Sequence, residues 1–186
     1  RVTGGSLALS GVNVEMGIPP QAGDWSLFEL QTADLKLDRA ALTLRRESAI
    51  ASEDSLATAV DVRAPASAET ITMLSTGMES PPLKLDLTDC LVRGDALFIR
   101  AHELQPLHLT WNNGLLVSRE RLLTVTGHSA GRAGGSFAVD LKHVTLATQR
   151  GAVLVNYGDA MRNPTKLELA ASDSIFLNAA RHGESP

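Results

Sequence analysis

The chain has 186 residues, which is enough for one domain and short for two. Its 17 Lys and Arg against 21 Asp and Glu give a formal net charge of -4, which argues against nucleic-acid binding because that function needs a basic surface. Aromatic residues make up only 4% of the chain, so the core must be aliphatic and a stacking platform for sugars has little material. No apolar run reaches the roughly 18 residues of a membrane span. The single Cys90 excludes an internal disulfide and a multi-thiolate zinc site.

The two ends of the sequence suggest a fragment. The chain begins at Arg1 with neither an initiator Met nor a signal peptide, and it stops at Pro186 without an evident terminal element. We therefore expect a single domain over residues 1–186, cut from a longer polypeptide. We expect an extracytoplasmic or cell-surface location.

An apolar spacing recurs along the chain. Two apolar residues at period two are followed by a two-residue break, and then by two more apolar positions at period two. The six copies are LALSGVNV from Leu7, LKLDRAAL from Leu35, LDLTDCLV from Leu85, LTWNNGLL from Leu109, VDLKHVTL from Val139 and LAASDSIF from Leu169. A degenerate seventh copy, VDVRAPAS from Val60, would divide the longest gap. Such a period is typical of a solenoid.

The two-residue break predicts a sharp corner between two strands that face one core. Its second member is Gly, Asp or Asn in four of the six copies, and these residues best tolerate a left-handed backbone. After the second strand, a short polar turn leads into a third apolar run in the middle copies, as in ALFIRA, RLLTVT and AVLVNY. The predicted fold is therefore all-β, a right-handed parallel β-helix of about six or seven coils with three short strands per coil.

Stacked coils predict columns of inward side chains. The first column comprises Leu7, Leu35, Leu85, Leu109, Val139 and Leu169, and the second comprises Leu9, Leu37, Leu87, Trp111, Leu141 and Ala171. The stretch from Arg39 to Ala66 fits the pattern poorly. It can be read as a coil with an insertion or as a short helix, because Ala and Leu are frequent there.

The strand, two-residue corner and strand pattern resembles the right-handed parallel β-helix of the pectin-lyase-like class, over roughly Ser6 to Asn178. The segments Asp89 to Leu123 and Val139 to Leu146 are also similar to the C-terminal regions of large planctomycete proteins, many of them described as serine/threonine protein kinases. The glycine loop, HRD loop and DFG motif of kinases are absent from this sequence. The resemblance therefore implies a bacterial origin without kinase activity.

A possible ligand face lies on the outward side of the predicted strands and corners. Its residues are Asp86, Asp89, Asn112, Asn113, Asp140 and His143. Thr110 is expected to lie between Asp86 and Asp140, and a pair of carboxylates in such a face is what a glycoside hydrolase uses. Hydrogen-bonded corners and solvated strand faces are the commoner role for these residue types. We assign no catalytic, cofactor-binding or metal-ligating residue, since none of the five histidines has paired metal spacing.

Three further features have simpler readings. Basic residues recur at the turn after the second strand: Arg45, Arg46, Arg93, Arg119, Arg121 and Arg150. Stacking of the coils would align some of them, either into a ridge that binds an acidic partner or into a solvated edge of mixed charge. Arg93-Gly94-Asp95 reads as a turn. Cys90 is expected to be a small buried side chain at the corner, and Trp111 to fill core volume.

These observations favour a non-catalytic β-helix module that acts as a structural or ligand- and partner-presenting domain of a larger bacterial protein. We expect no cofactor and no nucleic-acid partner, and either a protein or a glycan as ligand. Self-association through the solenoid ends is a further expectation. The alternatives are a carbohydrate-active enzyme, such as a polysaccharide lyase or hydrolase or a degenerate relative, and an extracytoplasmic sensor domain of a receptor-like kinase.

Overall fold

The computed structural model describes residues 1–19, 25–46, 57–63, 81–102, 105–127, 135–157 and 166–178. These residues form strands and connecting turns, with no helix among them. The chain begins with strands β1 (Val2–Thr3), β2 (Ser6–Ser10), β3 (Asn13–Ile18), β4 (Ser26–Gln31), β5 (Asp34–Asp38), β6 (Ala41–Arg46) and β7 (Thr58–Arg63). It continues with β8 (Leu83–Gly94), β9 (Leu97–His102), β10 (Leu107–Ser118), β11 (Leu123–Gly127), β12 (Ser136–Thr148), β13 (Val153–Tyr157), β14 (Lys166–Ser172) and β15 (Ile175–Asn178).

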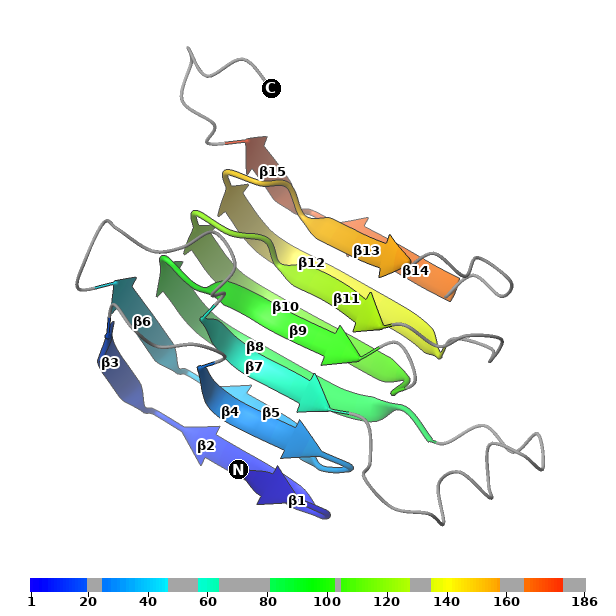
Figure 1. The fold of residues 1–186 in the computed structure, drawn as a ribbon. Helices are drawn as coiled ribbons and strands as arrows, with labels where there is room; N and C mark the ends of the chain where they lie inside the picture. The colour runs from blue at the N-terminus through cyan, green and yellow to red at the C-terminus, as the bar shows by residue number, and fades with distance from the viewer. Residues whose placement is uncertain are drawn as a thin grey trace, which may run out of the picture.

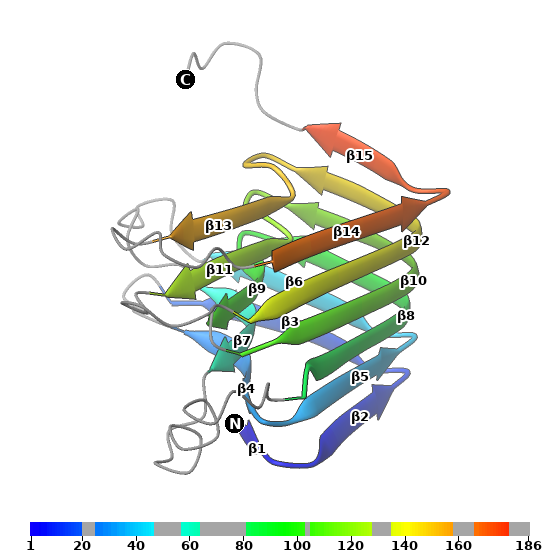
Figure 2. The same ribbon diagram turned by 90° about the vertical axis from the view of Figure 1, so that its right-hand side faces the viewer.

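The strands form two parallel sheets. One has the order β1-β4-β7-β9-β11-β13, and the other contains the path β14-β12-β10-β8-β5-β2 with β3, β6 and β15 beside it. The chain alternates between the two sheets, so that successive passes lie side by side in chain order from the N-terminus to the C-terminus (Figure 1). Figure 2 shows the second sheet from its side, with β2, β5, β8, β10, β12 and β14 stacked in that order. The prediction of an all-β, parallel arrangement is confirmed.

The predicted corner is present in all six copies. Its second residue has a positive φ in each: Gly11 (65°), Arg39 (49°), Asp89 (53°), Asn113 (56°), His143 (55°) and Asp173 (49°). Strands β8, β10 and β12 continue through this corner, whereas in the other passes it separates β2 from β3, β5 from β6 and β14 from β15. The left-handed residue turns the chain while keeping the apolar positions on both sides directed at one core.

The predicted columns are also present. The strand register aligns Leu7, Leu35, Leu85, Leu109, Val139 and Leu169, and it aligns Leu9, Leu37, Leu87, Trp111, Leu141 and Ala171. In the four inner passes these side chains are buried, and Leu109 and Trp111 have no exposed surface. An aliphatic core therefore runs across the stacked strands, as expected from a chain with few aromatic residues.

The degenerate seventh copy was a wrong prediction. Val60 lies in β7, where it pairs with Phe28 of β4 and Ile99 of β9, so it belongs to the first sheet and not to the columns of the second. Strand β5 pairs directly with β8, with Leu35 opposite Leu85, so six passes account for the stack. The error has a simple cause: period-two spacing marks any half-buried strand and does not say which sheet the strand joins. In the Arg39 to Ala66 stretch, β6 and β7 are strands, while 47–56 and 64–66 lie outside the described residues.

Trp111 is an aromatic residue in the otherwise aliphatic column, and it restricts which residue fits at position 114. The Trp111 ring lies 5.3 Å from that of Phe98, and its indole reaches over position 114. A Cβ built on Gly114 would lie 2.0 Å from Trp111 Nε1 and 2.7 Å from the Cys90 carbonyl oxygen. The other passes place Cys90 and Val144 at the equivalent site. The glycine at this corner is thus the steric complement of the only tryptophan in the column.

Candidate functional site

The outward residues of the predicted ligand face are aligned by the strand register. Thr110 of β10 pairs with Asp86 of β8 on one side and with Asp140 of β12 on the other, as predicted. Lys36 of β5 extends this column beyond Asp86, and Ala170 of β14 extends it beyond Asp140. Two strand spacings of about 4.8 Å separate the backbones of the two aspartates. They lie along a flat column of strands, with a threonine between them.

The Asp140 carboxylate is engaged by a neighbour within the same sheet. Its Oδ2 lies 2.7 Å from His108 Nε2, and both side chains are exposed. His108 precedes Thr110 by two residues on β10, so the contact joins adjacent strands across the surface. A carboxylate held in this way by an exposed histidine is a typical surface contact between strands.

The corner residues of the face also bond to one another. Asn113 Nδ2 donates to Asp89 Oδ1 over 2.6 Å, and His143 Nε2 lies 3.5 Å from Asp173 Oδ2. All four residues have positive φ. The same side chains that tolerate a left-handed backbone thus link one corner to the next, which favours a structural role for Asp89, Asn113 and His143.

The corner interpretation gives a direct prediction at position 113. We expect Asn113→Val to lower the free energy of unfolding by about 1–2 kcal/mol, because a β-branched residue is strained at positive φ and the bond to Asp89 is lost. Asn113→Gly loses the same hydrogen bond but relieves the backbone, so its effect should be much smaller. Urea unfolding of the two variants measures the difference. Equal losses would show that the side-chain bond, and not the backbone, sets the stability of the corner.

A shallow depression of ≈ 470 Å³ lies beside part of this face. Its polar lining includes Thr110, Asn112, Asp140, Lys142 and Ser172. Of the predicted ligand face, only Asn112 and Asp140 line it, and Asp86, Asp89, Asn113 and His143 lie outside this depression.

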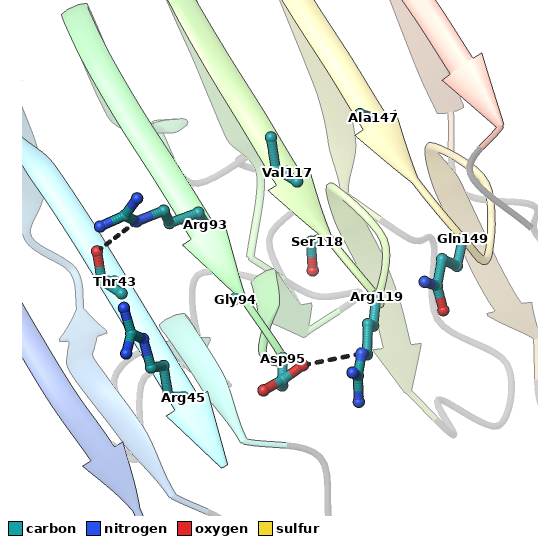
Figure 3. A pocket seen from close by; sticks show the side chains of 10 residues that line it. All are labelled: Thr43, Arg45, Arg93, Gly94, Asp95, Val117, Ser118, Arg119, Ala147 and Gln149. Carbon is teal, nitrogen blue, oxygen red and sulfur yellow. Dashed lines mark hydrogen bonds and ion pairs between the residues drawn. The ribbon is translucent and has the colours of Figure 1, made fainter.

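The predicted basic ridge is gathered more closely. Arg45, Arg93 and Arg119 line one depression of ≈ 330 Å³ on the strand segments that follow the corner, which we call the basic notch; its other lining residues are Thr43, Gly94, Asp95, Val117, Ser118, Ala147 and Gln149 (Figure 3). The register places Thr43, Arg93, Val117 and Ala147 in one row across four strands. Three arginines and one aspartate in the lining make the notch positively charged.

The three arginines of the notch are neutralised to different extents. Arg119 Nε lies 3.1 Å from Asp95 Oδ1, and Arg45 Nη2 lies 3.5 Å from Glu15 Oε1. Arg93 Nε donates to the hydroxyl oxygen of buried Thr43 over 2.9 Å, and no carboxylate of the described residues pairs with Arg93. Arg93 is therefore held in place by a neutral group, which leaves its charge uncompensated.

Arg150, another member of the predicted ridge, has an acidic partner. Its Nη1 lies 3.6 Å from Glu120 Oε2, and Glu120 is nearly buried in the turn between β10 and β11. Burial raises the pKa of the Glu120 carboxyl above its usual 4.5, and the charges of Arg150, Arg121 and Arg46 partly oppose that rise. Burial therefore disfavours the charged form of Glu120 in the folded state.

We expect this pKa shift to make the protein less stable as pH rises. The unfolded chain loses the Glu120 proton near pH 4.5, before the folded chain does, so the free energy of unfolding falls from that pH until the folded carboxyl has also ionised. Glu120→Gln should remove this part of the pH dependence and leave the rest. Urea unfolding of both proteins from about pH 4 to about pH 7 tests it. A difference between the two curves that does not change with pH would contradict the prediction.

Cys90 is buried at the corner, as predicted. Its thiol lies 3.2 Å from the Thr88 carbonyl oxygen and 3.5 Å from that of Leu37, and burial raises its pKa. A thiol of raised pKa is a poor nucleophile, so Cys90 acts as a small core residue.

The described residues contain no group of three or more His, Cys, Asp or Glu side chains arranged to hold a metal ion; His128 and His182 lie outside them. The part of the chain that the structure describes has no helix with the length and apolar character needed to cross a membrane. Comparisons with models of protein families, with curated proteins and with solved structures find no match for this chain. The resemblance to the pectin-lyase-like class thus rests on the strand and corner pattern.

Proposed function

We propose that this chain is a right-handed parallel β-helix with three strands in each coil, and that it serves as a non-catalytic module presenting a ligand or partner surface in a larger bacterial protein. The fold proposal is supported by the parallel register between successive passes and by the six left-handed corners. In such a coil the side chains on the outside of each sheet form flat rows, which suit recognition of an extended surface.

The functional proposal is carried by one observation: carboxylates of the predicted ligand face are already paired with neighbouring side chains. Asp140 is bound by His108 and Asp89 by Asn113, each across neighbouring strands. A glycoside hydrolase needs two carboxyl groups that converge on one bond and are free to act on it. Asp86 and Asp140 lie along one column, on either side of Thr110, and the Asp140 carboxylate is already paired with His108. The enzyme and sensor-domain alternatives remain predictions from the resemblance.

Turnover assays with matched variants test this proposal. We expect the chain to release neither reducing ends nor unsaturated uronates from a panel of neutral and acidic polysaccharides. Release of such products by the unmodified chain, abolished in Asp86→Asn or Asp140→Asn and retained in Glu15→Gln on the other side of the corner, would establish the enzyme alternative instead. Circular dichroism of each variant shows whether the fold is kept.

Self-association through the stack ends is part of the same proposal. Among the described residues, the last pass has a neighbouring pass on one side only, and its Leu169, Ile175 and Phe176 are 46%, 56% and 46% exposed. Exposed strand edges with apolar side chains are the usual sites of edge-to-edge association.

A further inference from the structure

We infer that the basic notch is a docking site for an acidic peptide segment of a protein partner, in which a Glu or Asp side chain pairs with Arg93 and an adjacent aliphatic side chain covers Val117 and Ala147. This inference rests on the proposed function, because it names the partner that such a module presents itself to. It is carried by three features: a free positive charge held in position, an exposed apolar floor, and strands whose backbone is already paired.

The first feature is the state of Arg93. Its Nε is fixed by Thr43, a residue of β6 that is 3% exposed, so the guanidinium is held in one direction before a ligand arrives. The carboxylates nearest in the lining and beside it are already used: Asp95 pairs with Arg119 and accepts the backbone N–H of Arg46, and Glu15 pairs with Arg45. A guanidinium presents a planar fork that matches a carboxylate with two parallel hydrogen bonds. Pre-organisation lowers the entropy lost on binding.

The second feature is the floor of the notch. Val117 pairs in register with Arg93 and Ala147, and it is 44% exposed although the rest of its row is polar or small. A carboxylate beside an aliphatic side chain complements this surface. A sugar ring is the less suitable ligand, because it binds best against an aromatic face and the notch is lined by none.

The third feature is the position of the notch in the sheet. Its floor is formed by β10 and β12, and Arg93 extends from the adjacent β8. All three strands have hydrogen-bonded neighbours on either side. An extended peptide therefore finds no free backbone edge there and cannot add a strand. Recognition must come from side chains, which accounts for the combination of Arg93 with Val117.

A titration with designed peptides tests the inference. The probe is a capped peptide with alternating Glu and Leu, and its controls replace every Glu by Gln or every Leu by Ser. In NMR spectra of the full chain, we expect the acidic peptide to shift the Val117 and Ala147 methyl signals and the Arg93 Nε–H signal. The Gln peptide should bind at least about tenfold more weakly, because the charged hydrogen bonds are lost, and the Ser peptide should also bind more weakly.

Matched variants locate the effect. Arg93→Gln should weaken binding of the acidic peptide by about tenfold or more, and Arg93→Lys should restore only part of it because lysine keeps the charge without the fork. Lys84→Gln, which removes one charge from the same strand before the corner, should bind as the unmodified chain does. Equal binding by the Arg93→Gln and Lys84→Gln variants would overturn the inference, since it would leave only a general charge attraction.

Two further arms separate the possible ligands. An oligouronate that binds the notch more tightly than the peptide, or a single-stranded oligonucleotide that does so, would overturn the assignment to an acidic peptide. No shift with any probe would overturn it as well, while leaving the non-catalytic module proposal standing. Product release in the turnover assay would refute that proposal instead, whatever the peptides do.

Discussion

Gly94→Ala is expected to lower the free energy of unfolding by about 3 kcal/mol or more, one of the two largest effects we predict, because it combines backbone strain with overpacking. Gly94 ends β8 with a φ of 132°, a value that other residues avoid. A Cβ there would lie 1.8 Å from the carbonyl oxygen of Leu44 on the neighbouring β6. Since that oxygen accepts the backbone N–H of Asp95, neither partner can move aside without breaking the turn.

Gly151→Ala is the matched control for this prediction. Gly151 also has a positive φ, 88°, but a Cβ there meets no atom within 4 Å. Gly151→Ala should lower the free energy of unfolding by about 1–2 kcal/mol, because only the backbone is strained. The difference between the two urea midpoints therefore isolates the close approach of β8 to β6. Similar losses at both sites would show that β8 and β6 are not packed as described, and the Thr43–Arg93 contact would lose its support as well.

Leu109→Ala is expected to lower the free energy of unfolding by about 2–5 kcal/mol, through lost burial and the cavity that remains. Leu109 has no exposed surface and lies between Leu85 and Val139 in the first column. Leu169 occupies the same column in the last pass but is 46% exposed. The same replacement there should lower the free energy of unfolding by about 1 kcal/mol or less, because the side chain is only half removed from water.

The pair Leu109→Ala and Leu169→Ala tests the stacking, since both have the same chemistry and the same place in the repeat. Denaturant unfolding measures each, with an unchanged slope showing that the unfolded state is not altered. Equal losses at the two positions would contradict the order of the passes. A large loss at Leu169 alone that depends on protein concentration would instead reveal that the last pass is covered by association in solution.

In the candidate sites, the sequence predicts which residues are aligned on neighbouring strands but not which side chains bind one another. The sequence predicted that Thr110 lies between Asp86 and Asp140, because all three occupy the same place in well-spaced copies. It did not predict that His108 would bind Asp140, since that contact depends on side-chain direction between strands. It predicted a ridge of arginines, but not that Thr43 would hold Arg93, which lies 50 positions further along the chain.

The sequence by itself determined the strands on either side of each corner, the corners and the inward columns. Side-chain alternation is a property of a single strand, and tolerance of positive φ is a property of single residues such as Gly11 and Asn113, so both can be read locally. Only the tertiary structure decided which strand neighbours which. Val60 has the spacing of a first strand yet joins the other sheet between β4 and β9, because pairing depends on hydrogen bonds to distant strands and on loop lengths that spacing does not encode. The charge left free at Arg93 follows from that pairing, since its register neighbours Thr43 and Val117 come from the passes before and after its own.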